Sequence, residues 1–157
     1  MHDPKTLEAG LEDYADVINQ LDGGWNSAMD LRFLRVTARE VVAEWVVGPQ
    51  HRQPYGIVHG GVHCGVIEAV CSTGAAISAL ASGYSVVGLE NHTSFIRAVR
   101  EGTLTARAHA IHPGRRSQVW EASILDAEQR TVATGRVRLI CLEPDATLAG
   151  EGVQTGR

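Results

Sequence analysis

The chain has 157 residues, enough for one domain, and its 18 acidic and 14 basic side chains give a net charge of −4. With aromatic residues at 5% and no basic stripe, it lacks the pattern typical of nucleic-acid binding. The three cysteines form no C-x-x-C pair, and no basic region followed by an apolar stretch opens the chain. We therefore expect a cytoplasmic protein that uses no disulfide framework, zinc ribbon, membrane or nucleic acid.

The first part of the chain predicts one short helix and two strands. Apolar residues recur at helical spacing over about residues 5–22, and Gly23-Gly24 closes this amphipathic helix. Between residues 30 and 47 the apolar residues alternate on either side of a Thr37-Ala38-Arg39 turn, which predicts two half-buried strands. The segment from residue 48 to 56 is dense in turn formers and predicts a loop.

The middle and last parts predict one long helix followed by four strands. Beyond Gly61, apolar residues keep the i, i+3, i+4 spacing for about five turns, and Gly83 ends this helix. Small residues fill its other faces, so it should be buried nearly all round. Antiparallel strands are predicted near residues 84–98, 102–111, 117–126 and 131–142.

These elements predict an α+β protein with a single domain over residues 1–142. Its core, about residues 30–142, should be a sheet of about six antiparallel strands wrapped around one long central helix. The Gly-rich, polar segment 143–157 has little to bury and is predicted to be a flexible tail.

Glu68 is the most informative single residue. It lies between Ile67 and Ala69 in the most apolar and glycine-rich run of the chain, nine residues after His59. Burying an ion without a partner costs several kcal/mol, so a carboxylate in this position needs a reason. We therefore regard Glu68 as a candidate for chemistry.

Several motifs stand in register with Glu68. They are Gln53, His59-Gly60-Gly61, Ser72, the strand ending Ser94-Phe95-Ile96-Arg97-Ala98-Val99, and the segment His112-Pro113-Gly114-Arg115-Arg116-Ser117-Gln118-Val119-Trp120-Glu121. Together they resemble the hotdog-fold acyl-CoA thioesterases of the PaaI-like and 4-hydroxybenzoyl-CoA thioesterase type, over roughly residues 30–142. The resemblance implies hydrolysis of an aryl- or medium-chain acyl-CoA without a cofactor, in a homotetramer built from dimers with composite active sites.

The resemblance also implies a role for each matching residue. Glu68 would act as nucleophile or general base, and the Gly60 N–H would stabilise the oxyanion. Gln53 would bond the same oxygen or the carboxylate, and His59 would hold the loop and the thioester. Ser72, one helical turn after Glu68, would hold the carboxylate or the attacking water. The candidates for binding substrate and coenzyme A are Gly61, Asn91, Phe95, Arg97, Arg115, Arg116 and Ser117, with Arg100 a weaker match.

Helix geometry adds a constraint. Gly60 and Glu68 are eight residues apart, which is about 12 Å along one helix axis. That is too far for both to touch one thioester carbon. Glu68 is therefore expected to work with Gly60 of another chain, in a dimer whose long helices run antiparallel.

Other interpretations of these residues stay open. His59 and His63 have the i, i+4 spacing of a zinc-binding pair, but no H-E-x-x-H motif is present and no metal is expected. Cys64 and Cys71 bracket Glu68 without an evident base, so packing is the favoured role. The alternative functions are a non-catalytic acyl-CoA-binding sensor and a hydroxyacyl-thioester dehydratase. The register of Gln53 and Ser72 favours hydrolysis.

Overall fold

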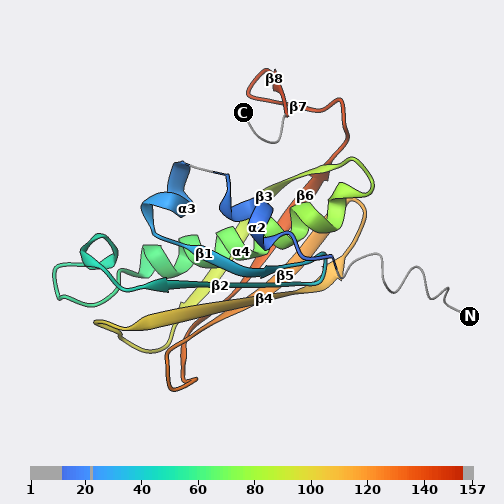
Figure 1. Cartoon of the computed structure of the whole chain (residues 1–157). Coiled ribbons are helices and arrows are strands. Elements are labelled where there is room, and N and C mark those ends of the chain that lie inside the picture. Colours follow the sequence, from blue (N-terminus) through green and yellow to red (C-terminus); the bar gives the residue numbers. More distant parts are fainter. Residues whose placement is uncertain (1–11, 22, 154–157) are drawn as a thin grey trace, which may run out of the picture.

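The computed structural model describes residues 12–21 and 23–153, and in it a curved six-stranded sheet surrounds a long helix (Figure 1). The helical elements are α2 (Ala15–Asn19), α3 (Gly24–Ala28), the 3-10 turn η1 (Pro49–His51) and α4 (Gly60–Leu80). The sheet contains β1 (Arg32–Val36), β2 (Glu40–Val46), β3 (Ser85–Phe95), β4 (Thr103–Pro113), β5 (Ser117–Leu125) and β6 (Thr131–Leu142). Its strand order is β1-β2-β4-β5-β6-β3, and every pairing is antiparallel. The predicted α+β architecture is confirmed.

Helix α4 fills the concave face of the sheet. Val66, Ile67 and Val70 are fully buried there, and at Gly74 an added Cβ would overlap the Trp120 indole, so glycine permits the close approach of helix and sheet. By length and composition alone α4 could cross a membrane, with a mean hydropathy of 1.3, which the sequence analysis did not expect. Half of its apolar window is buried inside the protein, so a position in the core accounts for this composition.

Strand β3 lies at one edge of the sheet and carries a bulge. Its pairing with β6 shifts register between Gly88 and Glu90. Beyond the bulge, Asn91 contacts α4, whereas Glu90 and His92 line a hollow on the outer face of the sheet. The bulge therefore decides which β3 side chains face the helix.

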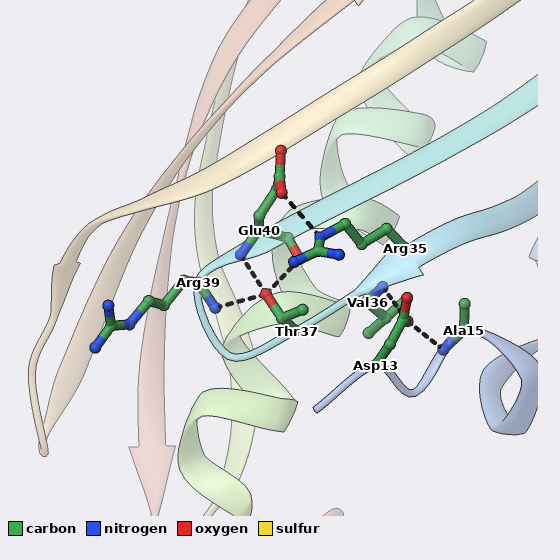
Figure 2. Close-up of polar contacts among 7 residues, drawn as sticks. All are labelled: Asp13, Ala15, Arg35, Val36, Thr37, Arg39 and Glu40. Atoms are coloured by element: carbon green, nitrogen blue, oxygen red, sulfur yellow. Dashed lines mark hydrogen bonds and ion pairs between the residues drawn. The ribbon is translucent and has the colours of Figure 1, made fainter. Parts of the chain in front are cut away.

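The N-terminal helix is shorter than predicted. Residues 12–14 carry no helix, and the part predicted over residues 5–11 lies outside the described residues. The Asp13 carboxylate accepts hydrogen bonds from the backbone N–H groups of Val36 at 2.9 Å and Ala15 at 3.0 Å (Figure 2). The bond from Val36 is the main cause that holds the pKa of Asp13 below its ordinary value. The hydrogen bond between Asp13 and β1 thus holds this segment in a non-helical conformation just before α2.

The predicted turn between the first two strands is confirmed. Thr37 Oγ1 accepts hydrogen bonds from the N–H groups of Arg39 at 3.2 Å and Glu40 at 2.9 Å (Figure 2). Arg35 and Glu40 form an ion pair of 3.1 Å across it. A side chain that bonds its own backbone in this way stabilises a tight turn.

Four further features differ from the predicted elements. Strand β3 ends at Phe95, three residues before its predicted end at residue 98. Helix α3 forms where only a glycine turn is expected, and β4 continues to Pro113 through a bulge between Ala110 and His112. After β6, the two-residue strands β7 (Thr147–Leu148) and β8 (Glu151–Gly152) form a hairpin. Ala149 and Gly150 have φ values of 51° and 86°, as a two-residue hairpin turn requires. The flexibility of this tail stays a prediction.

Candidate active site

The Glu68 carboxylate is half-buried on the side of α4 that faces β3. Its Oε1 accepts a hydrogen bond of 3.1 Å from Ser72 Oγ, one helical turn later, and its Oε2 accepts one of 2.9 Å from Asn91 Nδ2. Gly88 of β3 lies against the same group, because an added Cβ there would overlap Oε1. The structure therefore holds the carboxylate in a niche between the helix and the edge strand.

Asn91 lies beside this carboxylate, although the sequence analysis placed it among the substrate-binding residues. Its Nδ2 also donates to the Cys64 carbonyl at 3.1 Å, and its Oδ1 accepts from Thr93 Oγ1 at 2.6 Å. Sequence analysis missed Thr93 and Gly88. An isolated glycine inside a strand indicates a bulge or a close approach, which could have singled out Gly88, but no sequence signal marks Thr93. We call Glu68, Ser72, Asn91 and Thr93 the carboxylate cluster.

The start of α4 forms a second group. His59 is the N-cap residue, and its Nδ1 accepts a hydrogen bond of 2.8 Å from the Gly61 N–H, which leaves the ring proton of the neutral form on Nε2. The Gly60 N–H makes no hydrogen bond within residues 12–21 and 23–153. The Phe95 ring packs on Gly60, where an added Cβ would come within 2.9 Å of it. A free donor thus remains at the positive end of the helix dipole.

The loop before α4 is held by a buried histidine that the sequence analysis did not single out. His51 is fully buried, with Nδ1 accepting from the Gly48 N–H at 2.8 Å and Nε2 lying 2.9 Å from the Met29 carbonyl. Its own carbonyl accepts from the His59 N–H at 2.8 Å. Gln53 lies in the same loop, where its N–H donates to the Ile57 carbonyl at 2.9 Å. We call Gln53, His59, Gly60, Gly61 and Phe95 the helix-start cluster.

One chain keeps these two clusters apart. In the described part of the protein, Glu68 accepts hydrogen bonds from Ser72 and Asn91 and none from Gln53 or His59. Eight residues of α4 separate Gly60 from Glu68, or about 12 Å. Four residues of β3 separate Asn91 from Phe95, or about 13 Å. The helix and the strand thus independently give the same separation between the carboxylate cluster and the helix-start cluster.

The arginines expected to bind coenzyme A divide between the two ends of α4. Arg115 lines a hollow with Ser78, Ala79 and Ser82 at the C-terminal end. Arg116 follows it, and Ser117 begins β5. Arg97 lines a hollow together with Arg100 beyond the other end of β3. Arg100 donates to the Tyr55 carbonyl at 2.7 Å and so holds the loop before α4.

His63 and Cys71 lie buried on α4, and their surroundings keep both side chains uncharged at neutral pH. Among the described residues, no group of three or more His, Cys, Asp or Glu side chains could hold a metal ion. His63 packs beside Phe95 with ring centroids 6.3 Å apart, and burial lowers its pKa to about 4. Burial, and secondly the charge of Glu68, raise the pKa of the Cys71 thiol. A Cys71 thiolate is therefore an unfavourable nucleophile.

Known proteins share both the sequence pattern and the fold. The family model of the thioesterase superfamily matches residues 55–133. The Mycobacterium tuberculosis protein named "Putative esterase Rv1847" is 38% identical over 121 residues, which cover 76% of this chain and 86% of that protein. A 1,4-dihydroxy-2-naphthoyl-CoA hydrolase of Listeria monocytogenes is 32% identical over 113 residues, with 72% and 91% covered.

A solved structure gives the same result. Thioesterase HI1161 from Haemophilus influenzae superposes with a TM-score of 0.77 at 30% identity, with 82% of this chain and 90% of that chain covered. This family's sequence pattern thus occurs here together with a carboxylate on α4, a glycine at the start of that helix and a six-stranded sheet around it. The chain belongs to the thioesterase superfamily, has its hotdog fold and is a thioester hydrolase.

Proposed function

We propose that the protein hydrolyses an aryl- or medium-chain acyl-CoA to the carboxylic acid and free coenzyme A. The observation that carries this proposal is the Glu68 carboxylate, held by Ser72 and Asn91 at the sheet edge, together with a free Gly60 N–H at the start of the same helix. The name of the Listeria monocytogenes relative supports a coenzyme A thioester of an aromatic acid.

We place each active site between two chains. Neither cluster is complete alone, because about 12 Å separates Glu68 from the Gly60 N–H. Strand β3 offers a surface for pairing, since it is an edge strand whose Leu89 and Phe95 are 54% and 59% exposed. Antiparallel pairing of two β3 strands about Thr93 would set Asn91 opposite the partner's Phe95. Each carboxylate cluster would then face the partner's helix-start cluster.

The chemistry follows from this arrangement. In the nucleophilic route, a Glu68 oxygen attacks the thioester carbon, the thiolate of coenzyme A leaves, and water hydrolyses the mixed anhydride. In the general-base route, Glu68 takes a proton from the water that attacks the same carbon. In both routes the Gly60 N–H of the partner would donate to the developing oxyanion, assisted by Gln53. His59 would keep the loop in place through its cap on α4.

Coenzyme A would lie along the dimer contact. In the antiparallel pair that sets Glu68 opposite the partner's Gly60, the C-terminal half of each α4 runs past the start of the other helix. Arg115 and Arg116 of one chain would then approach Arg97 of the partner, and this cationic border suits the phosphates of the cofactor moiety. Ser117 would add a neutral donor. A homotetramer built from such dimers stays part of the proposal.

Release of free thiol from a panel of aryl- and alkyl-CoA thioesters tests the activity. We expect turnover of at least one class and a loss of about 10³-fold or more in Glu68→Gln, because the charged group at the reacting carbon is removed. Tight binding without thiol release from any thioester would refute the proposal in favour of the sensor. Conversion of a hydroxyacyl-CoA to its enoyl product would favour the dehydratase.

Mixed dimers test the shared site. A Glu68→Ala chain combined with a Gln53→Ala chain should regain part of the activity, because every heterodimer contains one intact composite site and one site that carries both changes. Either variant alone serves as the control. Heterodimers proven by mass spectrometry that stay inactive would count against a site built from two chains.

Single-turnover hydrolysis in H₂¹⁸O would separate the two routes, since the nucleophilic one first transfers a carboxylate oxygen to the product.

A further inference from the structure

The side-chain amide of Asn91 has hydrogen-bond partners for both its NH₂ group and its oxygen. Its Nδ2 donates to Glu68 Oε2 at 2.9 Å and to the Cys64 carbonyl at 3.1 Å, and its Oδ1 accepts from Thr93 Oγ1 at 2.6 Å. Two donor hydrogens thus meet two acceptors, and the amide oxygen meets a hydroxyl donor. This network joins β3 to two successive turns of α4.

The network permits only one orientation of the amide. If the amide were turned over, its oxygen would face the Glu68 carboxylate and the Cys64 carbonyl, two acceptors that could not bond it. The Thr93 hydroxyl would then have lost its acceptor as well. The Glu68 and Cys64 acceptors therefore select the orientation in which Asn91 presents its NH₂ group to Glu68, and the Thr93 hydroxyl holds the amide there by donating to its oxygen.

Two glycines and a bulge make room for this arrangement. At Gly135 of β6, the residue paired with Thr93, an added Cβ would lie 2.8 Å from Thr93 Oγ1 and 3.1 Å from Ile67 Cδ1. At Gly88 an added Cβ would overlap Glu68 Oε1. The register shift between Gly88 and Glu90 turns Asn91 and Thr93 toward α4. The sheet is thus shaped around this hydrogen-bond chain.

We propose that Asn91 and Thr93 are positioning residues of the thioesterase: Asn91 fixes Glu68 Oε2, and Thr93 fixes Asn91. Oε1 then remains the reactive oxygen, since in the described residues it accepts one longer bond of 3.1 Å, from Ser72. This inference rests on the proposed function of Glu68.

The Thr93→Val variant tests the chain of bonds at the smallest structural cost, because valine keeps the shape of threonine and loses its hydroxyl. We expect kcat to fall about three- to tenfold with little change in KM, and Asn91→Leu to lower kcat by about ten- to a hundredfold. In a Glu68→Gln background the Thr93→Val change should lower the residual rate no further, because its effect passes through that carboxylate. Thr93→Ser keeps the hydroxyl and should retain kcat within about twofold.

Thr134→Val is the matched control, because Thr134 lies on neighbouring β6 and lines the hollow on the outer face of the sheet. It should leave kcat unchanged. Melting curves of all variants show whether a fold defect accompanies a change in rate.

The outcomes separate this inference from the proposed function. A Glu68→Gln enzyme with wild-type rates would refute the proposed role of Glu68. An inactive Glu68→Gln together with a Thr93→Val enzyme of normal kcat would overturn only the positioning role. A lower kcat with a lower melting temperature, and an equal further loss when Thr93→Val is added to Glu68→Gln, would also overturn it, because that result reports a structural role alone.

Discussion

Replacing His63 by leucine should make the stability of the protein less sensitive to acid. The His63 ring is 3% exposed, and its Nδ1 is buried without a hydrogen-bond partner in the described part of the chain. Burial lowers its pKa from the ordinary 6.5 to about 4. The folded protein therefore holds this ring neutral in a pH range in which the unfolded chain binds a proton.

The sign and size of the effect follow from linkage. Since the unfolded state takes up the proton first, His63 costs no stability above pH 6.5, and stability falls as the pH drops from 6.5 toward 4. The difference between these pKa values corresponds to about 3 kcal/mol at 1.36 kcal/mol per pH unit. At pH 5.5 about 1.4 kcal/mol should already be lost.

Guanidinium unfolding of wild type and His63→Leu at pH 7.5, 6.5, 5.5 and 4.5 measures this contribution. Protein concentration must be fixed, because association would shift the midpoint. Below pH 6.5 the free energy of unfolding should fall less in the variant than in the wild type, by about 1 kcal/mol or more at pH 5.5. His109→Leu is the control, since His109 is exposed on β4. Parallel stability curves for wild type and His63→Leu would refute the reasoning.

Three further substitutions test packing and tethering. Gly88→Ala should lower kcat about a hundredfold in the thiol-release assay, because its Cβ would move the Glu68 carboxylate by roughly 1 Å; an unchanged kcat would contradict the niche. Gly65→Ala should push the Trp25 indole off α4 and shift tryptophan emission to the red, since the other two tryptophans are buried; an unshifted spectrum would argue against this contact. Asp13→Ala should cost about 1 kcal/mol in chemical unfolding by releasing two backbone hydrogen bonds, and a loss under about 0.3 kcal/mol would show that the tether is weak.

Local periodicity was enough to predict the elements that form the fold. The apolar spacing of α4 and the alternation of the strands report which faces are buried, and burial is what drives both elements together. The bond between Glu68 and Ser72 was also within reach of sequence, because residues four apart on a helix are neighbours.

Contacts between distant segments were out of reach. Asn91 meets Glu68 only because a bulge after Gly88 changes which β3 side chains face the helix, and no local pattern fixes that register. The early start predicted for the N-terminal helix failed for a similar reason: Asp13 bonds the backbone of β1, a segment 23 residues away in sequence. The hairpin at Ala149-Gly150 depends on two positive φ values that composition alone does not report.

The niche also explains how the protein tolerates Glu68 in an apolar helix. In the described part of the chain no lysine or arginine pairs with this carboxylate, and its donors are the neutral groups of Ser72 and Asn91. A cation would offset the desolvation more strongly, but it would also neutralise the charge that must attack carbon or activate water. One neutral donor on each oxygen, and a half-buried position at the sheet edge, offset part of that cost and leave the charge in place. The same edge position opens Glu68 to the Gly60 donor of a second chain, because the Gly60 of its own helix lies about 12 Å away, too far to reach the same thioester carbon.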